Sequence, residues 1–333
     1  MIDKKLLQFV KECDSYIITF HQNPDGDAIG SGLALHLFLK KLGKSGKVIS
    51  PNSVGNYLNW LPGVSEVIDF ESNVKTASRA IASAKAIFCL DFNDPNRTGE
   101  IERYLVDSKA KKVLIDHHLE PKDFTHYRYH STESPATAQL IFGLIEAIDE
   151  TQLDSDIATC MYTGLMTDTG SFRFPSTNAG THRAIARLMQ TGFDHAKIHE
   201  LIFDTYSKDQ LHLLGNTISN RHELLDDYKT SIMHITIADY KQFNIQKGDT
   251  EGVVNYNLQI QGVVFGVLFI ENDEMIKISF RSKGDFPANE FAKRYFQGGG
   301  HLNAAGGRSF ISLEKTIKKF KSKLKDFVKE YPL

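Results

Sequence analysis

Two aspartates and a histidine follow the first predicted strand of this 333-residue chain. The segment HQNPDGD places His21, Asp25 and Asp27 after the apolar run YIITF and directly before a predicted helix. Ligands of α/β sheets bind where strands end and helices begin, so we expect the turn to expose both carboxylates at the sheet edge. Asp27 could instead cap the helix. His21 favours a cation site, because it adds a third ligand at the same turn.

Three further segments carry polar side chains at the ends of predicted elements. The run AIFCL ends at Asp91, KKVLI ends at Asp116-His117-His118, and Asp168 closes a helix that otherwise carries little charge. Taken singly, the histidine pair could lie on the surface and Asp168 could be a capping residue. We expect Asp116 to orient His117, because metal-bound imidazoles usually need such a hydrogen-bond partner.

Together these segments predict a metal centre in one domain. The set contains four carboxylates and two imidazoles: His21, Asp25, Asp27, Asp91, His117 and Asp168. It suits two hard to borderline divalent ions, manganese or magnesium more than zinc, because it contains no thiolate. Two such ions activate water and stabilise charge on a phosphoryl group during in-line attack. Asp91 stands alone at the end of a central strand, and we expect it to bridge the two ions.

A glycine cluster in the last third of the chain predicts an anion site. Gly298, Gly299, Gly300 and His301 are consecutive, and Arg281 lies upstream in SFRSK. Glycines let backbone N–H groups approach an anion, and His301 and Arg281 can donate to the same phosphate. For the glycines alone, the alternative is a hinge or a tight turn. We expect these five residues to bind substrate.

The elements that position these residues are typical of an α/β protein with two domains. From residue 16 to about 118, short β-rich runs alternate with helical stretches, as in βαβ units around a parallel sheet. Residues 134 to 224 are mainly helical, and strands return after about residue 229, followed by a lysine-rich helix. We predict a parallel-sheet catalytic domain over 1–190, a helical linker over 191–228, and a smaller α/β domain over 229–333.

Composition and charge exclude several classes of protein. The chain is 41% hydrophobic and 24% charged, which suits globular domains and excludes disordered or fibrous folds. Its 39 basic and 41 acidic side chains give no general basic surface for long duplex nucleic acid. Its three cysteines are widely spaced and predict no disulfide framework. The apolar runs fall short of the roughly 20 residues of a membrane span, and the amphipathic start is unlike a signal peptide, so we expect a cytoplasmic protein.

The segments HQNPDGDAIGS, CLDFND, DHH and TDTGSFRF resemble, in order, the four motifs of the DHH phosphoesterase superfamily. The glycine cluster and SFRSK resemble the nucleotide-binding motif of the DHH-associated C-terminal domain. The resemblance covers nearly the whole chain and is greatest for the NrnA-like group. It implies hydrolysis of very short RNAs and of 3′-phosphoadenosine 5′-phosphate, and two domains that face each other across a cleft. It also implies that His117, the first histidine of the pair, binds metal, and we predict that His118 contacts the scissile phosphate or the leaving oxygen.

Two other functions stay open at this stage. One is an inorganic pyrophosphatase or exopolyphosphatase of the same superfamily, and the other is a non-catalytic nucleotide sensor. The glycine cluster and Arg281 favour a nucleotide substrate, and the complete set of metal ligands argues against a sensor. The sequence leaves open the choice among short RNA, nucleoside bisphosphate and linear dinucleotide, and the oligomeric state, with a homodimer among the options.

Overall fold

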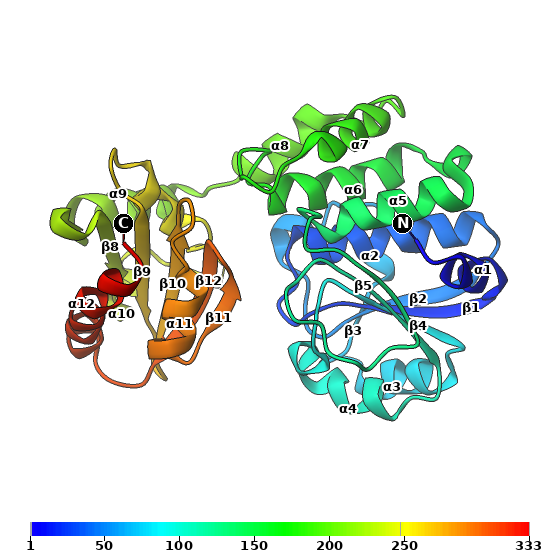
Figure 1. The fold of residues 1–333 in the computed structure, drawn as a ribbon, viewed down its shortest axis with the longest axis horizontal. Coiled ribbons are helices and arrows are strands. Elements are labelled where there is room, and N and C mark those ends of the chain that lie inside the picture. The colour runs from blue at the N-terminus through cyan, green and yellow to red at the C-terminus, as the bar shows by residue number, and fades with distance from the viewer. Residues whose placement is uncertain (1, 247, 333) are drawn as a thin grey trace. The chain divides into compact units, whose positions relative to one another are not determined.

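The computed structural model describes residues 2–246 and 248–332. The chain divides into two compact units, the first ending at Thr205 and the second beginning at Tyr206 (Figure 1). Helix α8 (His195–Phe203) belongs to the first unit and α9 (Lys208–Asn220) to the second. Both lie in the segment that the sequence assigned to a linker, and the functional boundaries at 190 and 228 stay a prediction.

The first unit contains a six-stranded sheet in the order β3-β2-β1-β4-β5-β6. All its pairings are parallel, which confirms the predicted parallel sheet. The two outermost strands, β3 and β6, are short and were not predicted. The strands are β1 (Ser15–Thr19), β2 (Ser45–Ser50), β3 (Ile68–Asp69), β4 (Ala86–Leu90), β5 (Lys111–Asp116) and β6 (Tyr127–His130).

Helices cover both faces of this sheet, because alternate strand residues point to opposite faces and both sets are apolar. Ile18 and Phe88 pack into the core beneath one group of helices, whereas Ile17 and Ile87 pack into the core on the other face. The first group is α1 (Lys4–Glu12), α2 (Gly26–Lys41), α5 (Thr137–Asp149) and α6 (Ser155–Asp168), with α7 (Ala179–Met189) and α8 packed on α6; the second is α3 (Val74–Ser83) and α4 (Glu102–Asp107) (Figure 1).

The second unit is a mixed sheet in the order β11-β12-β10-β9-β8-β7. The β8–β9 pairing is parallel and the others are antiparallel. Phe269 packs against α12 residue Phe320 on one face, and Leu268 packs near α9 residue Leu213 on the other. The elements are α9, β7 (His222–Leu225), β8 (Thr230–Ile235), α10 (Ile237–Gln242), β9 (Phe265–Glu271), β10 (Ile276–Ser282), α11 (Ala288–Phe296), β11 (Gly299–His301), β12 (Ala304–Ser309) and α12 (Leu313–Glu330).

Two expectations about the whole chain can be compared with the described residues. The three cysteines are free and buried, in agreement with the predicted absence of a disulfide framework. Within residues 2–246 and 248–332, we find no helix that has both the length and the apolar character needed to span a bilayer.

Candidate metal centre

The predicted ligands of the first unit lie at the point where its strand order reverses. Successive strands add on one side of β1 up to β3, and the chain then returns to β4 on the other side. Sheets of this order bind ligands beyond the carboxyl ends of the strands at that reversal. His21 follows β1, Asp91 directly follows β4, and His117 directly follows β5. The topology therefore brings together side chains that are up to about a hundred residues apart in the sequence.

Asp91 lies at the centre of this group. Its side chain is nearly fully buried, with Oδ1 3.4 Å from His117 Nε2 and Oδ2 3.5 Å from His21 Nε2. Its backbone is left-handed, with φ 60°, a conformation that costs free energy in a non-glycine residue and is often found at functional sites. The backbone N–H of Asp91 donates to the carbonyl of Ile115 at 3.1 Å. This bond ties the turn after β4 to β5.

Two triads of ligand atoms meet here, one of which includes Asp91, and the atoms of each lie within 4.8 Å of one another. The His21 triad contains His21, Asp25 and Asp91, with 3.8 Å between His21 Nε2 and Asp25 Oδ1. The His117 triad contains Asp27, His117 and Asp168. Nε2 of His117 lies 3.3 Å from Asp168 Oδ2 and 3.9 Å from Asp27 Oδ2. All six predicted ligands are thus close together in the first unit.

The first turn of α2 holds the two aspartates differently. Asp25 is the N-cap of α2 and accepts hydrogen bonds from the backbone of Asp27 and Ala28, so the capping role considered for Asp27 belongs to Asp25. The side chain of Asp25 is 51% exposed, whereas that of Asp27 is fully buried. The expectation that the turn exposes both carboxylates is therefore wrong for Asp27, which the first turn of the helix directs inward.

Hydrogen bonds from the start of α5 fix Asp27. The backbone N–H groups of Thr137 and Ala138 donate to its carboxylate at 2.6 and 2.9 Å, and the Ser31 hydroxyl donates at 3.1 Å. Thr137 also donates from its hydroxyl to Asp91 at 3.0 Å. Sequence reasoning missed these partners. The only local signal is the sequence SPAT, in which Pro135 precedes a helix start.

The electrostatics of the cluster indicate an excess of negative charge, because its four carboxylates outnumber its two imidazoles. Burial, followed by the charge of Asp91, raises the pKa of Asp27 to about 7. Burial and the neighbouring carboxylates also raise the pKa of Asp168 well above its usual range. Against the effect of burial, hydrogen bonds to carboxylates raise the pKa of His21 and His117 to about 10.

These side chains fit a metal centre on two grounds. Their carboxylate and imidazole donors are the types that divalent manganese and magnesium accept. A divalent cation in each triad would also remove the repulsion that now disfavours the ionised forms of Asp27 and Asp168.

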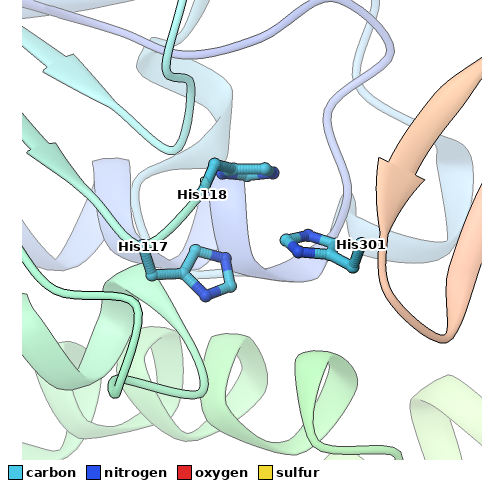
Figure 2. Close-up of side chains that lie close together, drawn as sticks. All are labelled: His117, His118 and His301. Atoms are coloured by element: carbon cyan, nitrogen blue, oxygen red, sulfur yellow. The ribbon is translucent and has the colours of Figure 1, made fainter. Parts of the chain in front are cut away.

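The DHH triplet, Asp116 to His118, uses its side chains differently from the prediction. Asp116 Oδ1 lies 2.7 Å from His118 Nδ1, whereas His117 Nδ1 lies 3.2 Å from the carbonyl of Ser134. Asp116 therefore orients His118, and the expectation that it orients His117 is corrected. Figure 2 shows the two rings where the chain leaves β5; their centroids are 4.8 Å apart in an edge-to-face arrangement.

The predicted substrate residues lie in the second unit. Arg281 on β10 pairs with Ala304 on β12, which pairs in turn with His301 at the end of β11. Residues aligned across adjacent strands point to the same face of a sheet, so Arg281 and His301 share a face. Their separation is about 10 Å at the backbone, two strand spacings.

The glycine cluster lies in the hairpin β11–β12, and close packing explains why two of its positions are glycine. A Cβ on Gly298 would lie 1.9 Å from the carbonyl of Gly306, and one on Gly300 would lie 2.4 Å from the carbonyl of Ala304. A Cβ on Gly299 would meet nothing within 4 Å. Close approach to the backbone of β12 therefore accounts for Gly298 and Gly300, whereas Gly299 has no such packing constraint.

Comparison with known families identifies the class of protein to which this fold and site belong. Residues 15–165 match the DHH family, N-terminal domain, and residues 229–330 match the DHHA1 domain. The chain belongs to the DHH family and is a DHH-superfamily phosphoesterase with a DHHA1 domain. The family predicted from the motifs is thereby confirmed.

Three relatives are similar over most of their length. A crystal structure described as an exopolyphosphatase-related protein from Bacteroides fragilis is 36% identical, with a TM-score of 0.95, and the match covers 98% of this chain and 97% of that one. The uncharacterized protein MG371 of Mycoplasma genitalium is 30% identical over 94% of this chain and 91% of its own length. The bifunctional oligoribonuclease and PAP phosphatase NrnA of Thermus thermophilus is 29% identical over 87% of this chain and 82% of its own length.

Proposed function

We propose that this chain is a manganese-dependent phosphoesterase that hydrolyses short oligoribonucleotides to nucleoside monophosphates and 3′-phosphoadenosine 5′-phosphate to AMP. Asp91 carries the proposal, because its two oxygens face His117 and His21 in different triads, at 3.4 and 3.5 Å. Ligand sets that share a carboxylate suit a pair of ions acting on phosphate esters. The similarity to the Thermus thermophilus NrnA supports the choice of nucleotide substrates.

The ligands divide between two ions in this proposal. The His21 triad would hold one ion and the His117 triad the other, and Asp91 would be the ligand shared between them. Manganese fits these carboxylates and imidazoles, and magnesium is the alternative. When bound, the ions activate the attacking water and stabilise negative charge on the phosphoryl oxygens.

His118 is assigned to the scissile phosphate or to the leaving oxygen. Its Nδ1 is bound to Asp116, so Nε2 is the ring nitrogen that contacts the substrate. Asp116 is fully buried, and its hydrogen bond limits the rotation of the imidazole. Because the His118 ring is already oriented before the substrate binds, it can stabilise the negative charge that develops on the phosphate without first having to reorient.

The second unit supplies the residues that bind the substrate's terminal phosphate. Arg281 and His301 donate charge-assisted hydrogen bonds to that phosphate, and the backbone of Gly299 and Gly300 adds N–H donors. Gly298 was expected to contribute as well, but its N–H donates to the carbonyl of Ala292 at 3.2 Å. The shared sheet face of Arg281 and His301 supports this assignment. Short nucleotides suit a chain whose net charge is −2, because this charge provides no overall electrostatic attraction for long nucleic acid.

A product time course tests the proposed function. Purified protein with manganese is incubated with a dinucleotide, a pentanucleotide, 3′-phosphoadenosine 5′-phosphate, a linear second-messenger dinucleotide and pyrophosphate. We expect nucleoside monophosphates from the oligonucleotides and phosphate plus AMP from the bisphosphate. Manganese binding without hydrolysis of any substrate would instead support a nucleotide sensor.

A second candidate function is an exopolyphosphatase or pyrophosphatase. The structural similarity to the Bacteroides fragilis protein described as exopolyphosphatase-related favours it. Release of phosphate from pyrophosphate or polyphosphate, with the nucleotides left intact, would replace the nucleotide proposal with this one.

A further inference from the structure

We propose that His130, at the end of β6, is a positioning residue for His118. It acts by holding the backbone of the DHH triplet, and it does not touch the substrate itself. The inference rests on the proposed contact between His118 and the phosphate. It assigns a function to a strand that the motifs do not include.

The register of β6 brings His130 beside the triplet. In the parallel pairing, Asp116 lies opposite His130. The imidazole of His130 reaches two residues further along and donates from Nε2 to the carbonyl of His118 at 2.6 Å. Because a carbonyl only accepts, Nε2 carries the proton in this bond.

The residues that follow His130 hold the rest of the triplet. The N–H of Ser131 donates to the carbonyl of Asp116 at 3.3 Å, and the carbonyl of Ser134 lies 3.2 Å from His117 Nδ1. All three residues of the triplet are therefore held by one short segment, 130–134. His130 is the member of this segment whose side chain makes the contact.

This support acts where the strand itself ends. β5 stops at Asp116, so the backbone of His117 and His118 lies beyond the last pair of the β5–β6 ladder. A side chain then supplies the hydrogen bond that the next strand residue would otherwise supply. The side chain of His130 is only 16% exposed, and partial exclusion of water strengthens such a bond.

His130 also lies close to the carboxylate that orients the His118 ring. Asp116 Oδ1 accepts from His118, whereas Oδ2 is buried and accepts no hydrogen bond from any described residue. His130 Nε2 is 4.0 Å from Oδ2. Loss of the His130 imidazole would therefore remove a hydrogen bond from the backbone of His118. It would also leave space beside Asp116, the carboxylate that orients the His118 ring.

His126 provides a matched control at the other end of β6. Its Nδ1 accepts a hydrogen bond from the backbone N–H of Lys112 at 3.1 Å. It thus joins β6 to β5 through a histidine–backbone bond, as His130 does, at the opposite end of the strand pair from the triplet. A purely structural role in holding β6 would make the two histidines equivalent.

The kinetic experiment compares His130→Leu, His130→Gln and His126→Leu with the unmodified protein on a dinucleotide. His130→Leu should lower kcat about 10–100-fold, the usual effect of losing a residue that orients a ligand or catalytic group. KM and bound manganese should stay within about twofold, because uniform substrate binding is not removed. His130→Gln keeps an N–H near the position of Nε2 and should recover most of kcat.

Three outcomes would overturn the proposal. They are an unchanged kcat in His130→Leu, an equal loss in His126→Leu, and a loss of manganese that parallels the loss of kcat. The last would make His130 a support of the metal centre and not of His118.

A measurement independent of turnover separates this inference from the proposed function. In the magnesium-loaded protein, the ring C–H resonance of His118, identified by its loss in His118→Gln, should shift in His130→Leu and stay in place in His126→Leu. An unshifted resonance would refute the positioning role. An unmodified protein that hydrolyses none of the substrates refutes the proposed function, whatever the resonance does.

Discussion

Among single residues, Asp91 is the one whose carboxylate lies close to both triads, with Oδ1 3.4 Å from His117 Nε2 and Oδ2 3.5 Å from His21 Nε2. Asp91→Asn should lower turnover about 10³-fold or more, because the loss of a shared anionic ligand removes several kcal/mol of charge stabilisation. Bound manganese should fall below two ions per chain. The fold should persist, since asparagine tolerates the left-handed backbone found at this position. Metal analysis, turnover and thermal unfolding measure the three effects.

The matched control for this change is Asp94→Asn. Asp94 accepts a hydrogen bond from the backbone of Asn96 at a helix start, where asparagine caps as well as aspartate. The Asp94→Asn variant should therefore keep full turnover and bind both ions. Full activity of Asp91→Asn with two ions bound would exclude the bridging role.

The two histidines of the DHH triplet should differ in what their loss removes. His118→Ala should lower turnover about 10²–10³-fold, as for other positioned electrostatic donors, with both ions retained. His117→Ala should lose metal, because its Nε2 lies 3.3–3.4 Å from carboxylates of Asp168 and Asp91. Metal analysis of both variants distinguishes the roles, and the reverse pattern would require them to be exchanged.

The difference between these histidines shows what a sequence predicts at this scale. Motif residues could be found because they lie at the ends of strongly apolar elements: after strands β1, β4 and β5, or, for Asp168, at the end of helix α6. The partner of Asp116 was assigned wrongly, although alternation could have corrected it: residues two apart in an extended chain point to the same side. Asp116 and His118 are such a pair. The contacts of Thr137 and Ser134 depend on distant segments meeting in space, and no local pattern encodes them.

At the scale of elements, apolar strands were predicted well and short or glycine-rich ones were not. β6 has only four residues, and its sequence YRYH carries charge, so its pairing with β5 depends on neighbours outside the segment. β11 and β12 contain four glycines, a composition that is unfavourable for strands. These missed elements carry two residues to which the proposals assign roles: β6 carries His130 and β11 carries His301.

The packing of α2 against α6 should limit the size of residue 164. A Cβ on Gly164 would lie 2.8 Å from Asp27 Oδ1 and 2.9 Å from the side chain of Ala138. Gly164→Ala should therefore displace the Asp27 carboxylate, weaken manganese binding and cost about 1–3 kcal/mol of unfolding free energy from overpacking. Manganese titration and denaturant unfolding check both effects.

Gly215→Ala on α9 is the control for the helix position alone. A Cβ there would meet nothing within 4 Å, so the change should stabilise the protein by about 0.5–1 kcal/mol. Unchanged metal affinity in Gly164→Ala would contradict the steric argument for Asp27.

For the whole molecule, the described chemistry divides between two units with separate cores. The predicted metal ligands all lie in the first unit, and Arg281 and His301 lie in the second. If the second unit binds the substrate phosphate and the first performs hydrolysis, the two contributions should respond differently to the choice of substrate. A small generic ester should need the metal centre alone.

Arg281→Ala should therefore raise KM for phosphate-bearing nucleotides about ten- to a hundredfold, since a charge-assisted hydrogen bond is worth roughly 1.5–3 kcal/mol. Hydrolysis of bis-p-nitrophenyl phosphate should change much less. Lys277→Ala removes a positive charge from the same strand, where Lys277 pairs with exposed Glu251, and should leave both reactions unchanged. Equal losses on both substrates in Arg281→Ala would place this residue in the chemical step, because a residue that only binds the nucleotide cannot slow a reaction that lacks one.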